Sequence, residues 1–412
     1  MKLRNRFLLV GLGIVVFTLT TPVIVLYALG YKLDVRTGQV TKTGSLVVRS
    51  EPNRSQVYID DVLQSTKSGS TIRFLLPGDY NFKIAREGYQ SWTKRLNIKP
   101  GLVTWANQDR EFVSLFLNAP VLEETHEISW ASISLDDQSA VVVKNDGTFT
   151  YNPDNQDFDA VSNQMPIIDP PVQIPNSESA YFYNRDASAR LFTPAQLTAS
   201  TQLESNGRYG VLLVDSNLLL SRDGTVTTFA ANVSGFHLEN EHLWFTQQNT
   251  LKHATLNMGV IEEVIALPYS PIKSQIIRGN SQLFLILDQT AYALNDKLEE
   301  IYRGALDAYW EPEGNRLVIS NNNEAILFDP GSFRSELIIR SSSAIKQPFA
   351  NYHSGYLFFI NEDKIKAIEL DGRDHRNVYT ISSEPFESFL ISNDGTYLTT
   401  LTDTNVKTYQ IR

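Results

Sequence analysis

A long run of apolar residues opens the chain. No charged side chain lies between Phe7 and Tyr31. An α-helix rises about 1.5 Å per residue, so about 20 apolar residues cross the bilayer core of about 30 Å. The run therefore predicts one transmembrane helix within residues 1–31. A cleaved signal peptide is the alternative, but its apolar region usually has only about 7–15 residues.

The charges beside this run indicate its orientation. Lys2, Arg4 and Arg6 precede it, whereas Lys32 and Arg36 follow it, partly offset by Asp34. Cytoplasmic flanks of membrane helices favour Lys and Arg. We therefore expect a single-pass protein of the cell membrane, with a cytoplasmic N-terminus and the bulk of the chain on the extracytoplasmic side.

A polar segment, residues 32–43, follows as an expected linker, and residues 44–117 then alternate between apolar and polar side chains. A period of two residues is typical of half-buried strands, and Pro and Gly separate the alternating runs. This pattern predicts a small antiparallel β-sandwich. Its expected strands are Ser45–Arg49, Gln56–Asp60, Ile72–Leu76, Tyr80–Ile84 and Trp92–Ile98.

Ordered short motifs in residues 44–117 resemble those of the PEGA domain, a small β module of exported and membrane-anchored bacterial and archaeal proteins. The motifs are Ser50-Glu51-Pro52, Val57-Tyr58-Ile59-Asp60, Leu76-Pro77-Gly78-Asp79-Tyr80, Glu87-Gly88-Tyr89 and Pro100-Gly101. Two departures occur: the Pro-Glu-Gly-Ala tetrapeptide reads Pro52-Asn53-Arg54-Ser55, and the usual Asp-Gly turn reads Asp60-Asp61. The resemblance implies a spacer or adhesion role and no catalytic residues.

Residues 118–412 repeat a pattern of short strands with a period of about 40 residues, which is typical of β-propellers. Eight hairpins predict eight blades. Seven blades are the alternative, because the third hairpin begins soon after the second. The second strands of the predicted blades are Ala140–Val143, Ala180–Tyr183, Gly210–Val214, His242–Phe245, Gln282–Leu287, Arg316–Ile319, Tyr356–Ile360 and Tyr397–Leu401.

This half of the chain resembles the WD-repeat-like, quinoprotein-like and Tol-type propellers in pattern only. The last repeat, residues 386–412, has room for three strands. An unpaired strand edge invites aggregation, so a propeller ring has to be closed. We expect either Phe112–Leu117 or Val121–Glu124 to supply the missing outer strand.

Composition excludes several kinds of chemistry. The 412 residues include no cysteine, which excludes disulfides, a thiol nucleophile and Cys-ligated metals. The formal net charge is −10, although residues 1–117 are net positive. The large domain is therefore broadly acidic and should repel nucleic acid, so no nucleic-acid partner is expected.

Catalytic and metal motifs are weak. Ser91 and Lys94 fit a Ser-x-x-Lys motif, but they lie in a strand pattern and their order relative to Lys42-Thr43-Gly44 is reversed from the penicillin-binding enzymes. His237 and His242 are too few for a metal site, and the oxygen-rich loop 152–159 lacks the Gly and Glu positions of a calcium loop. No catalytic residue, cofactor or metal ligand is assigned.

Two tryptophans are the candidate binding-face residues. Trp130 and Trp310 occupy first-strand positions, near the inner end of the predicted ring. The sequence favours a non-catalytic scaffold that is anchored in the membrane and binds protein, peptide or glycan at the cell envelope. The alternative is a propeller enzyme, such as a hydrolase, a lyase or a quinone-dependent dehydrogenase, with its site at the mouth of the central channel.

Overall fold

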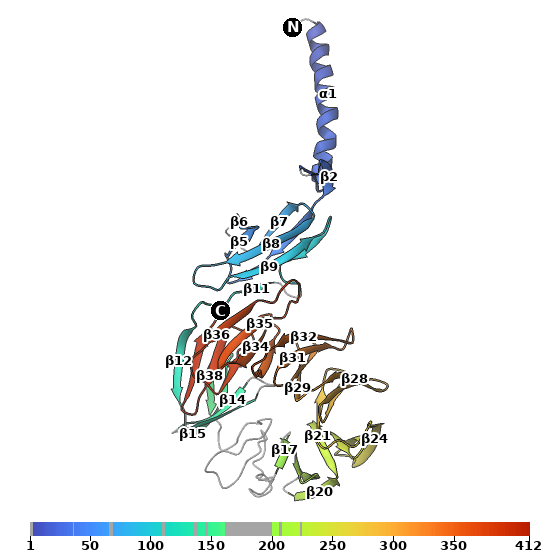
Figure 1. The fold of residues 1–412 in the computed structure, drawn as a ribbon, viewed down its shortest axis with the longest axis vertical. Helices are drawn as coiled ribbons and strands as arrows, with labels where there is room; N and C mark the ends of the chain where they lie inside the picture. The colour runs from blue at the N-terminus through green and yellow to red at the C-terminus, as the bar shows by residue number, and fades with distance from the viewer. Residues whose placement is uncertain are drawn as a thin grey trace. The chain divides into compact units, whose positions relative to one another are not determined.

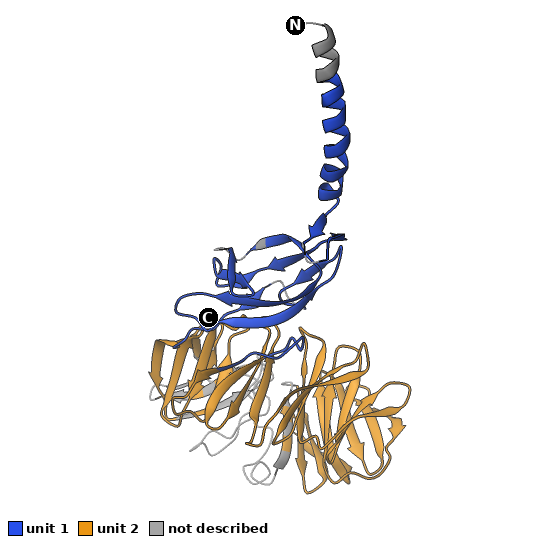
Figure 2. Ribbon diagram, turned by 45° about the horizontal axis from the view of Figure 1, so that its top comes forward, with its two compact units in different colours: residues 1–119, 369–379, 412 blue, residues 120–368, 380–411 orange. Residues whose placement is uncertain are grey.

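The computed structural model describes residues 3–35, 37–65, 69–108, 112–134, 139–144, 147–160, 200–205, 208–222 and 225–412. The chain divides into two compact units, coloured in Figure 2. The first comprises Met1–Ala119, Glu369–Tyr379 and Arg412, and the second comprises Pro120–Ile368 and Thr380–Ile411. The short segment 369–379 thus belongs to the first unit, although it lies late in the sequence.

One helix, α1 (Leu3–Ala28), begins the first unit (Figure 1). Within it, the 19 residues Val10–Ala28 are long and apolar enough to cross a membrane. At about 1.5 Å per residue they extend about 28 Å, close to the thickness of a bilayer core.

The segment expected to be a linker forms a β-hairpin instead. Strands β1 (Tyr31–Asp34) and β2 (Gln39–Lys42) pair antiparallel, with Leu33 opposite Val40. Gly38 has a φ of +68°, a left-handed conformation that glycine adopts without strain. The polar composition of the segment hid two strands of only four residues each.

The small β domain contains all five predicted strands. Its strands are β3 (Gly44–Val48), β4 (Ser50–Glu51), β5 (Gln56–Ile59), β6 (Val62–Ser65), β7 (Ser70–Leu75), β8 (Gly78–Ala85), β9 (Trp92–Ile98), β10 (Val103–Trp105) and β11 (Val113–Ser114). One sheet has the antiparallel order β6-β5-β8-β9, and another has the order β10-β3-β7. Two parallel pairs, β10 with β3 and β11 with β4, were not predicted, because strands of two or three residues are too short to show a period.

A core of buried residues holds the described part of this domain together. Leu46, Val57, Phe82 and Trp92 are among its fully buried members. The Asp60-Asp61 departure from the PEGA motif leaves the hairpin turn intact: both residues adopt positive φ, 46° and 64°, between the paired Ile59 and Val62. Two-residue hairpin turns require this geometry, and Asp tolerates it.

The second unit is a β-propeller. Its described residues form seven four-stranded antiparallel sheets. In chain order the sheets are β13 (Trp130–Ser134), β14 (Ser139–Lys144), β15 (Gly147–Asn152) and β16 (Asp157–Ala160); β17 (Ser200–Ser205), β18 (Tyr209–Val214), β19 (Asn217–Arg222) and β20 (Thr225–Ala231); β21 (Val233–Glu239), β22 (His242–Gln247), β23 (Thr250–Thr255) and β24 (Val260–Ala266); β25 (Ser274–Arg278), β26 (Leu283–Leu287), β27 (Thr290–Leu294) and β28 (Leu298–Arg303); β29 (Asp307–Glu311), β30 (Arg316–Ser320), β31 (Glu324–Asp329) and β32 (Arg334–Arg340); β33 (Lys346–Asn351), β34 (Tyr356–Asn361), β35 (Lys364–Glu369) and β36 (Val378–Ser382); and β37 (Ser388–Ile391), β38 (Tyr397–Leu401), β39 (Asn405–Gln410) and β12 (Val121–Glu127).

Seven of the eight predicted hairpin strands coincide with the second strands of these sheets, from β14 to β38. The remaining one, Ala180–Tyr183, lies outside the described residues. The part of the chain that the structure describes therefore holds seven blades, the number that the sequence left as the alternative.

The last sheet confirms the expected closure. β12 pairs antiparallel with β39, so the chain segment that begins the propeller completes its final sheet. Of the two segments proposed for this role, Val121–Glu124 supplies the strand, whereas Phe112–Leu117 contains β11 and pairs within the first unit. The buried Tyr151 hydroxyl joins the next sheet to this one through hydrogen bonds with Thr399 and Thr408 at 3.0 and 2.6 Å.

Candidate binding sites

A small pocket in the propeller contains one of the two predicted tryptophans. Its volume is about 150 Å³. Three successive first strands, β29, β33 and β37, lead into the loops that surround it. The pocket is lined by Tyr309, Trp310, Glu313, Phe349, Tyr352 and Asn393, among others.

Trp310 packs against Phe284 and also lines the pocket. Its ring stacks on Phe284, with 5.5 Å between centroids, and a Cβ on Gly279 would lie only 3.2 Å from the indole. Its Nε1 is buried and has no hydrogen-bond partner among the described residues. The packing on Phe284 fixes the indole, so the ring lines the pocket in one orientation.

Hydrogen bonds between loops hold the rim of this pocket. The Asn351 amide donates to the carbonyls of Ser392 and Asn393, both at 3.1 Å. The backbone and side-chain amides of Asn393 donate in turn to the Asp154 carboxylate, both at 2.6 Å. Asp154, a residue weighed for calcium binding, thus serves as an acceptor for a neighbouring loop.

Glycines allow these loops to approach one another. A Cβ on Gly314 would collide with the Tyr352 ring, and a Cβ on Gly395 would lie 2.7 Å from Ser354 Cβ. Glu311 is buried, and its carboxylate accepts hydrogen bonds from the backbone N–H groups of Glu313 and Gly314 at 3.2 and 2.5 Å. The recurring Gly in the loops after first strands is the sequence signal that could have located the pocket.

The other sequence candidates do not converge. Trp130 lies in β13 opposite Val143, and its side chain is outside the described residues. His237 lies 3.3 Å from Glu204, whereas His242 pairs with the imidazole of His253 at 2.9 Å. Within the described ranges, no three His, Asp or Glu side chains are grouped so that they could hold a metal ion.

The Ser-x-x-Lys match has no catalytic geometry. Ser91 is exposed, whereas Lys94 is buried in β9. Successive side chains of a strand point to opposite faces, so residues three apart face opposite ways. The two groups therefore do not form a nucleophile and base pair.

Lys94 instead forms a buried ionic cluster with the segment 369–379. Its Nζ lies 3.0 Å from Glu369 Oε2 and 3.6 Å from Asp371 Oδ2, and it donates to the Asp371 carbonyl at 2.8 Å. Trp92 Nε1 donates to Glu369 Oε1 at 2.9 Å. The three charged side chains are 0%, 2% and 4% exposed. In the structure the buried positions of β9 alternate and include Lys94, but nothing in the sequence identified its partners.

The surroundings of Asp371 in the cluster favour its charged form. Burial alone would raise the pKa of the Asp371 carboxyl. Hydrogen bonds from the Arg373 side chain and backbone, together with the charge of Lys94, outweigh that effect and lower the pKa below its ordinary value. The carboxylate therefore stays ionised next to the buried ammonium.

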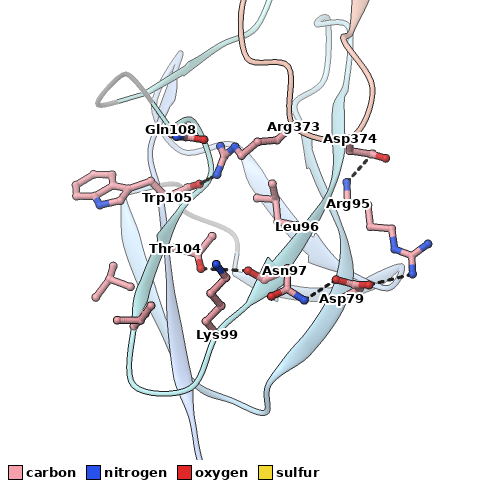
Figure 3. Close-up of a pocket in the computed structure, with 12 residues that line it drawn as sticks. Asp79, Arg95, Leu96, Asn97, Lys99, Thr104, Trp105, Gln108, Arg373 and Asp374 are labelled. Carbon is pink, nitrogen blue, oxygen red and sulfur yellow. Dashed lines mark hydrogen bonds and ion pairs between the residues drawn. The ribbon is translucent and has the colours of Figure 1, made fainter. Parts of the chain in front are cut away.

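A larger, open pocket of about 620 Å³ lies in the first unit (Figure 3). β9, the turn after it, β10 and the segment 369–379 all contribute to its lining. Asp79 accepts hydrogen bonds from Asn97 at 2.7 Å and from Arg95 at 3.3 Å, and the Arg95 backbone N–H donates to Asp374 at 2.9 Å. Trp105 is 39% exposed beside these groups. Such a mixture of amide, carboxylate, cation and indole suits a polar, elongated ligand, and the volume falls in the range of about 300–1,000 Å³ usual for small-molecule sites.

Comparisons with known proteins complete the description. No match was found among curated proteins. The solved structures with a similar fold include the extracellular domain of a protein described as a one-component system from B. thetaiotaomicron, at 13% identity and a TM-score of 0.39, covering 71% of this chain and 39% of that chain. They also include a catalytically inactive virginiamycin B lyase from Staphylococcus aureus with quinupristin, at 13% identity and a TM-score of 0.38, covering 70% of this chain and 99% of that chain.

The first of these alignments spans well under half of the other protein's length. The family comparison addresses the small β domain, whose sandwich and turns are described above. Residues 43–111 match the family model of the PEGA domain.

Proposed function

We propose that this protein is a non-catalytic binding scaffold of the cell envelope. α1 anchors it in the cell membrane, and its bulk lies on the extracytoplasmic side, where the propeller binds a protein, a peptide or a glycan. Three observations support the proposal: the apolar span Val10–Ala28, the match of residues 43–111 to the PEGA domain, and the propeller of the second unit.

The pocket at Trp310 is the observation that carries the binding role. Its volume of about 150 Å³ is below the usual range of about 300–1,000 Å³ for small-molecule and cofactor sites. It suits a single side chain of a protein or peptide ligand. Tryptophan is enriched where such anchors bind, and a rim already held by hydrogen bonds loses little entropy on binding.

The polar groups at the pocket favour binding over catalysis. Glu311, the buried carboxylate there, is bonded to the backbone N–H groups of its own loop. A general base must reach a substrate proton within about 3 Å. A carboxylate that holds a loop in place is a structural acceptor, which is the role we assign to Glu311.

A matched pair of tryptophan variants tests the proposal. Trp310→Phe shortens the ring that lines the pocket but keeps an aromatic ring over Phe284. Trp244 also has a buried Nε1 without a partner among the described residues, but it lies outside this pocket, so Trp244→Phe is the control. Random displayed peptides are selected on the full chain in detergent, and their affinities for the variants are measured.

We expect selected peptides to share one apolar or aromatic anchor residue. Trp310→Phe should weaken their binding about tenfold, or about 1.4 kcal/mol, whereas Trp244→Phe should leave it unchanged. Melting temperatures of the two variants should agree, since each loses one similar group. Selection of no peptide, or equal losses in both variants, would contradict binding at this pocket.

A further inference from the structure

The hairpin β1–β2 is tied closely to the end of α1. The N–H and Oγ1 of Thr43 donate to the Gly30 carbonyl at 2.8 and 2.7 Å, and the Gly101 N–H donates to the Thr43 carbonyl at 2.9 Å. Tyr27, in the last turns of α1, stacks on Phe74 of β7 with 4.9 Å between centroids. These contacts fix the hairpin and the turn at Gly101 beside the helix end.

The two faces of the hairpin differ. Leu33 and Val40 lie directly opposite each other and are 56% and 54% exposed. Lys32 and Thr41, the next pair, point to the other face because side chains alternate along strands. The hairpin therefore presents an apolar cross-strand pair outward on one face, and polar side chains on the other.

The helix length places this face at the bilayer boundary. Val10–Ala28 extends about 28 Å and fills a core of about 30 Å. β1 begins three residues after Ala28, so the hairpin falls at the level of the lipid headgroups. An apolar pair exposed at that depth has acyl chains and headgroups, rather than bulk water, as its neighbours.

Exposed cations surround the same end of the unit. Lys42 and Lys99 are both exposed, and the Lys42 side chain lies beside Gly101. Leu102 and Val103, which follow, are 56% and 58% exposed. Lysines near an anionic leaflet are attracted to it, and long lysine stems lie along apolar surface while their ammonium groups reach the headgroups.

We propose that the hairpin face bearing Leu33 and Val40 inserts into the headgroup layer of an anionic bilayer. The hairpin is then a second, interfacial anchor that holds the first unit against the membrane surface. The inference rests on the membrane placement of α1 in the proposed function. Continuity with that helix, the amphipathic register and the lysines identify lipid as the occupant.

Because the sequence contains no cysteine, one introduced thiol is the only site that a thiol-reactive label can modify. The full chain is reconstituted in vesicles containing phosphatidylglycerol, with an environment-sensitive fluorophore on Val40→Cys or, as the matched control, Thr41→Cys. Lipids that carry a quencher near the headgroup report insertion. A third label, on Val16→Cys within α1, reports the span itself.

We expect quenching of the Val40 label to exceed that of the Thr41 label at least threefold, with a blue-shifted emission at Val40 only. Equal quenching at Val40 and Thr41, while the Val16 label is reached by quenchers deep in the acyl chains, would overturn the interfacial anchor and leave the helix anchor standing. A Val16 label that no lipid quencher reaches would overturn the anchor and this inference together.

Discussion

Two regions of the protein close their sheets in opposite ways. In the propeller, the edge of β39 is covered by β12 through a backbone ladder from Val121 to Glu127, with one register shift between Leu122 and Glu124. In the first unit, the edge of β9 is covered by side chains of the segment 369–379. Tyr379 donates to the Ser91 carbonyl at 3.2 Å, Asn377 to the Thr93 carbonyl at 3.0 Å, and the Arg95 N–H donates to Asp374 at 2.9 Å.

The difference teaches what each closure demands of the sequence. A ladder needs only strand-forming residues in register, so many sequences would satisfy it. Side-chain closure needs particular residues at particular positions, together with the buried pairing of Lys94 with Glu369 and Asp371. The sheet closed by the β12–β39 ladder should therefore tolerate side-chain substitutions and lose stability when the strand is deleted. The edge of β9, which side chains cover, should lose stability on single substitutions.

The largest expected effect is the loss of the ladder. Deleting residues 121–127 would expose the edge of β39 and remove its hydrogen bonds, each worth about 0.5–1.5 kcal/mol. We expect the propeller to lose about 5 kcal/mol or more, measured by chemical denaturation of the full chain in detergent. The double variant Val121→Thr with Leu122→Thr, which changes only exposed side chains, should stay within about 0.5 kcal/mol of the parent. Similar losses for both changes would show that side chains, not the ladder, close the propeller.

A somewhat smaller effect is expected at Lys94. Lys94→Ala leaves the buried Glu369 carboxylate without its ammonium partner and Asp371 with Arg373 as its remaining cation, and breaking such a buried pair typically costs about 3–5 kcal/mol. Lys99→Ala, at an exposed lysine beyond the end of the same strand, should cost less than about 0.5 kcal/mol. Unfolding is followed through tryptophan fluorescence, to which Trp92 and Trp105 of the first unit contribute. A Lys94→Ala protein as stable as Lys99→Ala would mean that the segment 369–379 is held without the ionic cluster.

A third effect depends on pH. The folded pKa of Asp371 is lowered, so its stabilising contribution is present above the unfolded value of about 3.9 and is lost as pH falls through the folded pKa. Glu384 of the propeller also has a lowered pKa, from the Tyr409 hydroxyl and Lys407, but its side chain is 55% exposed, against 4% for Asp371. Between about pH 4 and pH 2, Asp371→Asn should therefore flatten the fall in stability more than Glu384→Gln. A larger flattening by Glu384→Gln than by Asp371→Asn would show that the exposed carboxylate, not the buried one, dominates the acid loss of stability.

The same contrast explains what the sequence could and could not predict. A period of two residues located the strands of both units, and the three-stranded last repeat indicated that an earlier segment must complete it, as β12 does. The regular positions of first strands in a repeat located Trp310, which lines a pocket; its role in binding stays a prediction.

What could not be predicted depends on pairs of side chains far apart in the chain. Lys94 lies in a strand that the sequence located, but its partner Glu369 lies far later in the chain, at the end of β35, in what reads as an ordinary propeller strand. The hairpin at Leu33 and Val40 was missed for another reason: its strands are too short, and its polar residues too many, for alternation to stand out.

The most direct test of the account is the side of the membrane on which each part lies. Single cysteines are introduced at Asn5, before the apolar span, and at Asp296, an exposed propeller residue. Intact cells that produce either variant are treated with a membrane-impermeant maleimide. The account predicts labelling of Asp296→Cys in intact cells, and labelling of Asn5→Cys, on a full-length chain, only after permeabilisation. Protection of Asp296→Cys in intact cells, or loss of residues 1–31 from the mature protein, would contradict an anchored scaffold with an extracytoplasmic propeller.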